Sequence, residues 1–307
     1  MIWLRRLTIA FGLLAAAGAS AYYWLIIESH MPFNGSYTID IAELRKLADE
    51  KPGAKPMEIR VETVGTITFP KTAVVAGDGW EPTELPVSAY QLVYPDQTAM
   101  IDTAYDAVSA SKADAHNSDF DTSAYQRIVA ALNKASLIVI THEHWDHAAT
   151  LFAQPNLSKL LVVTKLTKEQ VDNADRLAPS SFPTNEKANY QPIAYDQYVA
   201  VAPGVVLVKS AGHTPGSQSV YVRRADGTEY LFIGDVAWHQ RNIDLVRERA
   251  RLVTWWFLNE DRGAVMLQLA ELKRLQETNP ELTIIPGHDP EVLARLLKSG
   301  RLIQRFE

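Results

Sequence analysis

The longest apolar stretch of the chain lies at its N-terminus. Residues 7–27 read LTIAFGLLAAAGASAYYWLII and contain no charged side chain. A helix rises about 1.5 Å per residue, so this stretch is long enough to cross a hydrocarbon core of about 30 Å. Arg5 and Arg6 precede it, and Glu28 is the first charge after it. The positive-inside bias therefore predicts a transmembrane helix whose N-terminus is cytoplasmic, with the remaining chain in the periplasm or exterior.

Two other interpretations of this stretch are open. Ala19, Ser20 and Ala21 form a small-residue site of the kind that signal peptidases cleave, and cleavage there would give a secreted protein. The apolar run continues through residues 22–27, however, and its aromatic rings suit a membrane interface. A buried core helix is disfavoured because the run is apolar on every face. We expect residues 1–30 to act as an uncleaved membrane anchor.

After the predicted anchor, apolar residues occur in shorter runs separated by polar residues. Residues 31–57 form a polar connecting segment with one amphipathic helix at 41–50. Runs of β-branched and aromatic residues predict strands, and apolar residues at helical spacing predict helices. Strands are expected at 57–69, 88–94, 98–106, 136–140, 161–165, 205–211, 219–224, 229–235 and 282–285, and helices at 123–135, 168–177, 264–277 and 291–300. This order predicts an α/β domain over residues 58–307, with a long surface loop at 174–192.

Composition and charge narrow the possible functions. The chain of 307 residues has a formal net charge of −6 and no stripe of Lys or Arg, so no nucleic-acid partner is expected. It contains no cysteine, which excludes disulfides and thiolate metal ligands. Any metal site must therefore be built from histidine and carboxylate side chains.

The densest group of such side chains is the segment THEHWDH at residues 141–147, directly after an apolar strand. His142 and His144 are two residues apart, so extended backbone points them the same way. Asp146 and His147 come where the chain turns into a helix, and they can swing to the same side. This spacing differs from the helical H-E-x-x-H pattern and can present ligands to two metals from one loop.

Further candidate ligands follow three other apolar runs. His213 lies in a GHTPG turn after VVLVK, Asp235 follows EYLFIG, and His288 and Asp289 follow LTIIPG. In each case a neighbouring glycine allows a turn or a close backbone approach. Any one of these residues is most often structural, but together with the first segment they form a recurring pattern of ligands at strand ends.

These segments together resemble the metallo-β-lactamase superfamily. The similarity lies in H-x-H-x-D-H at 142–147, G-H-T-P-G at 212–216, G-D at 234–235 and G-H-D at 287–289, and it extends over about residues 58–298. It implies a four-layer α/β/β/α sandwich with two metal ions, zinc by default and other divalent metals as alternatives. By resemblance the first metal is held by His142, His144 and His213, the second by Asp146, His147 and His288, and both by Asp235.

The resemblance also assigns roles to several aspartates. Asp146 and Asp235 are the candidate catalytic carboxylates, because they hold the metals. Asp102 and Asp289 are expected to orient ligands without binding metal. Asp289 can equally well cap the helix that follows it.

Two metals that share one water lower its pKa from about 15.7 towards 7. The resemblance therefore implies attack of metal-bound hydroxide on a carbonyl. The segments GHTPGSQS and PGHDPE are most similar to those of N-acyl homoserine lactonases, so the expected reaction is opening of a lactone or ester. Phosphodiester or β-lactam cleavage on the same site, or a non-catalytic metal-binding membrane module, are the alternatives. The expected partner is a small molecule that carries an acyl chain.

Two aromatic features bear on the substrate. Lactonases of this group usually have Tyr three residues after the bridging Asp, where this chain has Trp238, so Trp238 and His239 are the possible substrate contacts. Trp255, Trp256 and Phe257 are three adjacent rings that cannot all face one core. We expect core packing with one ring reaching the surface. The alternatives are a wall for an acyl chain or a contact with the membrane surface.

Overall fold

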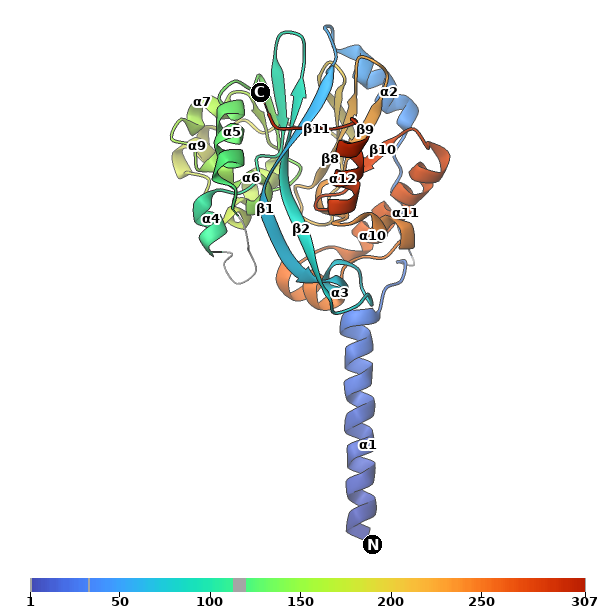
Figure 1. Cartoon of the computed structure of the whole chain (residues 1–307). Coiled ribbons are helices and arrows are strands. Elements are labelled where there is room, and N and C mark those ends of the chain that lie inside the picture. Colours follow the sequence, from blue (N-terminus) through green and yellow to red (C-terminus); the bar gives the residue numbers. More distant parts are fainter. Residues whose placement is uncertain (1, 33, 113–119, 307) are drawn as a thin grey trace.

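The computed structural model describes residues 2–32, 34–112 and 120–306, and two β-sheets form its centre (Figure 1). The six-stranded sheet has the order β11 (Ile303–Gln304), β1 (Glu58–Pro70), β2 (Pro82–Val93), β3 (Thr98–Ile101), β4 (Leu137–Val139) and β5 (Thr164–Lys165). The five-stranded sheet has the order β10 (Thr283–Ile285), β9 (Glu229–Phe232), β8 (Gln218–Arg223), β7 (Val205–Lys209) and β6 (Tyr198–Ala202). The mixed α/β class predicted from the sequence is thus confirmed.

Each sheet buries both of its faces. In β7, Val205 and Leu207 belong to the core between the two sheets, whereas Val206 and Val208 pack against outer helices. Because successive side chains of a strand point to opposite faces, a strand covered on both sides appears in the sequence as a continuous apolar run. The run VVLVK is such a strand, and the sheets therefore pack face to face.

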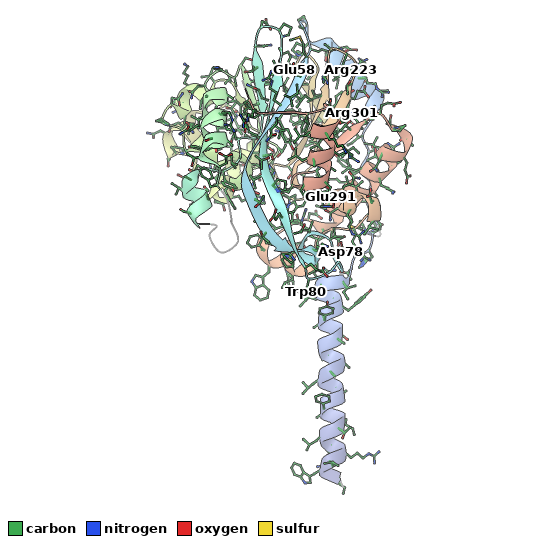
Figure 2. All side chains as sticks on the ribbon, viewed as in Figure 1. Glu58, Asp78, Trp80, Arg223, Glu291 and Arg301 are labelled. Atoms are coloured by element: carbon green, nitrogen blue, oxygen red, sulfur yellow. The ribbon has the colours of Figure 1, made fainter. Side chains whose placement is uncertain are left out.

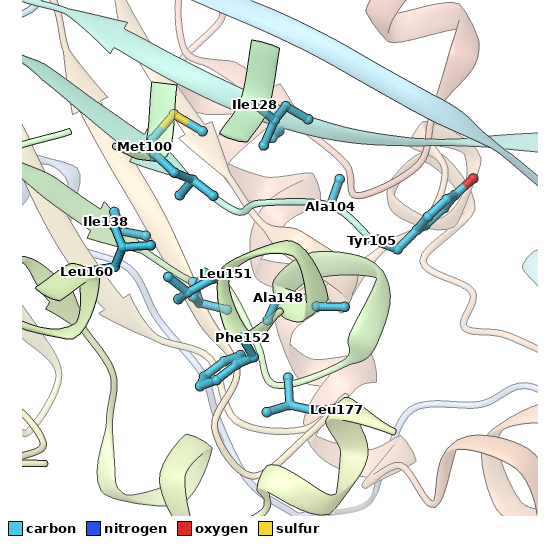
Figure 3. Close-up of a cluster of buried hydrophobic side chains, with 14 of the residues drawn as sticks. Met100, Ala104, Tyr105, Ile128, Ile138, Ala148, Leu151, Phe152, Leu160 and Leu177 are labelled. Atoms are coloured by element: carbon cyan, nitrogen blue, oxygen red, sulfur yellow. The ribbon is translucent and has the colours of Figure 1, made fainter. Parts of the chain in front are cut away.

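Helices cover the outer face of the first sheet. They are α4 (Ala107–Lys112), α5 (Thr122–Leu132), α6 (Trp145–Phe152), α7 (Leu157–Leu161), α8 (Lys168–Asp172), the 3₁₀ turn η2 (Ala174–Leu177) and α9 (Thr184–Asn189). Figure 3 shows part of the core below them, where Met100 and Ile138 of the sheet lie near Ile128 of α5 and Leu151 of α6.

A second helical layer covers the other sheet. It consists of α2 (Ile41–Glu50), α10 (Gln240–Leu245) and α11 (Arg262–Thr278), and α12 (Pro290–Lys298) adds side chains to the core between the sheets. Helix α2 lies in the predicted connecting segment 31–57, and its Leu44 is buried against the sheet, so this part of the segment packs on the domain. The order of layers is therefore helix, sheet, sheet, helix.

The N-terminal helix α1 (Ile2–Tyr22) projects away from the domain and continues into the π-helical turn η1 (Tyr23–Ile27) (Figure 1). Among the described residues, Ile2–Ile27 is the one helical stretch long and apolar enough to cross a membrane, and 6% of its most apolar window is buried. The buried core helix weighed from the sequence is therefore wrong. A membrane anchor and a signal sequence share this length and composition.

Three local predictions between residues 161 and 192 differ from the structure. The predicted loop 174–192 contains η2 and α9. The predicted strand 161–165 is reduced to the two residues of β5, because α7 runs up to Leu161. The predicted helix 168–177 is divided at Asn173 into α8 and η2. These segments are six residues long or shorter, so tertiary packing outweighs their local periodicity.

Candidate metal centre

The candidate ligands lie where strands of both sheets end. Strands β3 and β4 run parallel in the first sheet. In the second sheet β7 and β9 are both antiparallel to β8, and β10 is parallel to β9, so β7, β9 and β10 share one direction. The segments that directly follow these five strands carry Asp102, residues 141–147 with the first turn of α6, His213, Asp235 and His288.

The first group contains His142, His144, His213 and Asp235, whose candidate ligand atoms lie within 4.8 Å of one another. His144 Nδ1 lies 3.1 Å from His142 Nε2 and 2.9 Å from His213 Nε2. Asp235 Oδ2 lies 3.3 Å from His213 Nε2 and 3.6 Å from His142 Nε2. Three ring nitrogens and one carboxylate oxygen thus converge on one point.

The second group contains Asp146, His147, Asp235 and His288. Asp235 Oδ1 lies 3.2 Å from His147 Nε2 and 3.1 Å from His288 Nε2. The two ring nitrogens are 3.2 Å apart, and Asp146 Oδ2 lies 3.5 Å from His288 Nε2. The two oxygens of Asp235 therefore face different groups.

The donor atoms fit divalent cations. Four ligands at about 2.0–2.1 Å in tetrahedral geometry lie about 3.3 Å apart, which matches these separations. Three neutral imidazoles whose nitrogens face one another cannot all be satisfied by hydrogen bonds, since each ring carries a single proton. Asp235 Oδ1 is buried and receives no hydrogen bond of acceptable geometry, although two ring nitrogens lie near it. A cation between these atoms would satisfy all of them.

The second nitrogen of three of these rings has its own partner. His147 Nδ1 lies 2.8 Å from Asp102 Oδ2, and His288 Nδ1 lies 3.0 Å from the carbonyl oxygen of Pro86. His213 Nδ1 faces the carboxylate of Glu260. An N–H that donates to such a partner leaves Nε2 as the free lone pair, which is the usual arrangement around a metal-binding histidine.

Asp102 fixes the loop that carries four of the candidate ligands. Its carboxylate accepts hydrogen bonds from Thr141 N at 2.7 Å and from Thr141 Oγ1 at 2.8 Å, besides its contact with His147. Asp102 itself has a φ of 57°, a left-handed conformation that Asp tolerates better than most residues. The sharp turn after β3 thus aims the carboxylate at the end of β4.

Burial and neighbouring charges act differently on these histidines. Burial, and the neighbouring imidazoles, keep the pKa of His142 and of His144 well below the ordinary value, which favours the neutral form that binds metal. Burial acts the same way on His147, but Asp235 and Asp102 outweigh it and raise its pKa well above the ordinary value. A proton and a cation therefore compete for His147.

Two buried charged residues that sequence reasoning missed support this centre. Glu260 contacts His213 and forms an ion pair with Arg249. Arg249 also donates to the backbone oxygen of Asp235 at 2.9 Å, and its guanidinium lies 4.8 Å above the ring of Trp238. Neither residue belongs to a motif or a periodic pattern, so no signal in the sequence marks them.

Two predicted residues are not brought to the ligand groups. The carboxylate of Asp289 accepts hydrogen bonds from Val292 N at 2.8 Å and from Gln240 N at 2.6 Å, so the geometry supports the helix-cap interpretation. His239 is the N-cap of α10, and its Nδ1 accepts a hydrogen bond from Arg241 N at 3.1 Å. The same Nδ1 lies 3.4 Å from Asp289 Oδ2. It does not line the pocket above the candidate ligands.

That pocket has a volume of about 270 Å³ and opens over both groups. His144, Asp146 and Asp235 lie in it, and so does Arg176, whose Nη1 is 3.2 Å from His144 Nε2. Its apolar walls are formed by Ile67, Phe69, Trp145, Ala178, Trp238, Phe257 and Leu258. The indole N–H of Trp238 donates to Asp235 Oδ2 at 2.6 Å, so Trp238 contributes an apolar wall while its polar atom is already engaged.

The expected core packing of the three adjacent aromatic residues is wrong. Trp255, Trp256 and Phe257 are 61%, 83% and 69% exposed. They lie in the π-helical turn η4 (Val253–Leu258), which turns Thr254 and Leu258 inward and leaves these rings outside. Phe257 nevertheless reaches the pocket wall.

Comparison with solved structures shows that other proteins share this fold. A quorum-quenching N-acyl homoserine lactone lactonase superimposes with a TM-score of 0.60 at 19% identity, over 83% of this chain and 100% of its own. An N-acyl homoserine lactone hydrolase with N-hexanoyl-L-homoserine at its catalytic metal centre has a TM-score of 0.58 at 18% identity. The match covers 78% of this chain and 96% of the hydrolase. An AiiA variant from B. thuringiensis with N-decanoyl-L-homoserine bound superimposes with a TM-score of 0.58 at 19% identity. The match covers 78% of this chain and 96% of the AiiA chain.

These identities establish a shared fold and nothing finer. No curated protein matches the chain in sequence. The family model described as the metallo-beta-lactamase superfamily matches residues 82–288. Because this match spans more than half of the chain and lies on the fold just described, the protein belongs to the metallo-beta-lactamase superfamily.

Proposed function

We propose that the protein is a dinuclear metal-dependent hydrolase that opens a lactone or ester bond. The observation that carries the proposal is the position of Asp235, whose two oxygens face two separate donor groups on the floor of an apolar-walled pocket. His142, His144 and His213 would hold one cation with Asp235, and Asp146, His147 and His288 the other. Zinc is the metal expected for such nitrogen and oxygen donors.

Two cations held by these residues would supply a water of lowered pKa and would polarise the substrate carbonyl. Residues of the chain itself orient the ligand side chains. Glu260 and Asp102 orient the rings of His213 and His147, and Trp238 fixes one oxygen of Asp235 through its N–H. These contacts hold the donor atoms in place before substrate arrives.

The pocket supports an acyl substrate. Phe69 and Phe257 give its wall an apolar surface on which an acyl chain can pack. The guanidinium of Arg176 lies in the same pocket and is positioned to attract the carboxylate that hydrolysis of an ester or lactone releases. Lactonases with acyl-homoserine products are among the similar solved structures, which favours lactones within this class.

The test is metal analysis together with a substrate panel on the full chain in detergent. Acyl lactones, aryl esters, a β-lactam and a chromogenic phosphodiester are assayed side by side. We expect about two zinc ions per chain and turnover of lactones or esters. Asp235→Asn is expected to lose bound zinc and at least about 100-fold in turnover, because it removes the charge shared by both groups.

Asp121→Asn serves as the matched control. Asp121 caps α5 outside the candidate metal centre, and Asn is an equally good cap, so this variant should retain zinc and activity. Full zinc and full activity in Asp235→Asn would refute the site. Turnover restricted to the β-lactam or the phosphodiester would refute the substrate class, and two zinc ions without any turnover would indicate a non-catalytic metal-binding module.

We also propose how the chain is organised around this catalytic domain. Residues 1–30 would anchor the protein in a membrane, 31–57 would connect the anchor to the strands, and 58–307 would form the catalytic domain in the periplasm or exterior. The charge pattern of Arg5 and Arg6 before the apolar helix supports this orientation.

A further inference from the structure

Exposed aromatic side chains gather where the N-terminal helix meets the domain. Trp24, Trp80, Trp255, Trp256 and Phe257 all have large exposed fractions, and we call them the aromatic patch. Trp255 and Trp24 pack edge to face with ring centres 5.6 Å apart. Large exposed rings at one place indicate a surface that is covered by a partner or a membrane.

The helix is fastened to the domain beside this patch. The guanidinium of Arg251 lies 4.8 Å above the ring of Trp24 and forms an ion pair with Glu28. Gly77 N donates to the backbone oxygen of Ile26 at 2.9 Å, and Trp80 Nε1 donates to Tyr22 Oη at 3.1 Å. These contacts fix the direction in which α1 leaves the domain.

The length of the helix sets the level of the patch. From Arg6 to Trp24 the helix extends about 27 Å at about 1.5 Å per residue, close to the thickness of a hydrocarbon core of about 30 Å. With Arg5 and Arg6 at one interface, the other interface falls near Tyr22 and Trp24, where aromatic rings are favoured. Figure 2 places Trp80 at this end of the domain. A bilayer that holds α1 therefore meets the aromatic patch.

The patch is continuous with the pocket. Phe257 belongs to both, and its ring centre lies 6.3 Å from that of Phe69. Phe69 in turn lies 5.5 Å from Trp238, whose N–H reaches Asp235. An apolar path thus leads from the exposed rings to the carboxylate shared by the two donor groups.

We propose that the aromatic patch rests on the lipid bilayer and that the pocket takes its substrate from that bilayer. The substrate class is an amphiphilic ester or lactone with a long acyl chain, whose chain lies along Phe257 and Phe69. Hydrolysis breaks the acyl C–O bond of this substrate; water supplies OH to the acyl carbon and a proton to the leaving oxygen. The membrane contact stands on its own geometry, whereas the substrate class rests on the proposed function.

The absence of cysteine from the chain allows a direct test of the contact. Trp256→Cys and Val162→Cys each introduce a single attachment point for an environment-sensitive fluorophore. Val162 is a matched exposed apolar position, 77% exposed, at the C-terminal end of α7 in the helical layer of the first sheet. The full chain is reconstituted in phosphatidylcholine vesicles with and without spin-labelled lipid as a quencher.

We expect a blue-shifted emission and quenching by the spin-labelled lipid at position 256 and neither effect at position 162. Equal emission and quenching at both positions would overturn the membrane contact. A blue shift at position 256 without quenching would also overturn it, and would assign the patch to a second copy of the chain.

An activity series tests the substrate class. The double substitution Trp255→Ser and Trp256→Ser removes rings that do not line the pocket. It should reduce kcat/KM at least about tenfold for a long-chain ester or lactone carried in vesicles, and less than about twofold for a short-chain, water-soluble homologue. Equal losses on both substrates, or none, would overturn access from the bilayer. If the wild type turns over neither substrate, the proposed function fails, while the fluorophore result still decides the membrane contact.

Discussion

At the residue scale, the candidate centre depends on buried carboxylates that face the ring nitrogens of its histidines. Asp235 divides its two oxygens between two donor groups. The Nδ1 atom of His213 contacts the carboxylate of Glu260, whose side chain is buried and paired with Arg249. Because a buried carboxylate beside a ligand both orients the ring and raises its basicity, Glu260 should affect metal affinity without contacting the metal.

Glu260→Gln tests this role. The amide keeps a hydrogen-bond acceptor near His213 but loses the charge, so zinc affinity should fall about 10- to 100-fold. Competition with a chromogenic chelator measures it. Glu271→Gln is the matched control, since Glu271 is also buried and paired with an arginine, Arg274, but lies on α11 away from the centre. Equal affinity in both variants would contradict the orienting role.

At the scale of elements, polar contacts decide how helices attach to the sheets. Helix α2 is held by Arg45, whose Nε and Nη2 each donate to Glu229 of β9 at 2.7 Å, and Tyr221 donates to the same carboxylate at 2.8 Å. Burial opposes the charge of Glu229, but these bonds outweigh it and lower the pKa of this residue below the ordinary value of 4.5. The attachment of α2 therefore depends on an ionised Glu229.

A carboxylate with a lowered folded-state pKa stabilises the fold above its unfolded pKa, and this contribution is lost as the pH falls through the folded value. Glu229→Gln should therefore lower the Tm at pH 7, by about 2–4 °C. The difference from the wild type should shrink as the pH drops below about 4.5. Melting curves are recorded with a chelator, so that both proteins are free of metal and loss of metal in acid does not contribute to the difference in Tm. A difference that grows in acid would be the opposite of the expected result.

At the scale of the whole molecule, the donor groups join the two sheets. Asp146 and His147 follow a strand of the first sheet, whereas Asp235 and His288 follow strands of the second. Cations held between them would link both halves of the sandwich, so metal binding should stabilise the fold as a whole. If the N-terminal helix spans a membrane, as proposed above, it would hold this sandwich at one side of that membrane.

Removal of metal should lower the Tm of the full chain by about 5 °C or more, because a ligand at 100 times its Kd contributes about 2.7 kcal/mol. Added zinc should restore it. Scanning calorimetry in detergent, before and after chelation, gives the measurement. Asp235→Asn should show a much smaller change, and an unchanged wild-type Tm would argue against cations between the sheets.

Orientation across the membrane can be read with single cysteines in intact spheroplasts. Val162→Cys, in the domain, should react with a membrane-impermeant maleimide, whereas Ile2→Cys should react only after lysis. Labelling of the N-terminal position alone would place the domain in the cytoplasm. Recovery of a shortened chain in the soluble fraction would indicate signal cleavage.

The sequence by itself determined the family, the α/β class and the candidate ligands. The segment 141–147 and the turns at His213, Asp235 and His288 are local patterns, because a strand end, a glycine and a ligand lie within a few residues of one another. The apolar helix at 7–27 is equally local. Such signals depend on periodicity and spacing and can be read without knowing what packs against them.

Only the tertiary structure decided which distant side chains support these ligands. Glu260 reaches His213 across 47 positions, and Asp289 turns to cap α12 although it neighbours a candidate ligand. Trp255 and Trp256 lie outside because η4 turns their neighbours inward, which one segment alone cannot reveal. Burial and long-range contacts involve two or more segments that are far apart in the sequence. They are therefore decided only when both sheets have folded and packed together.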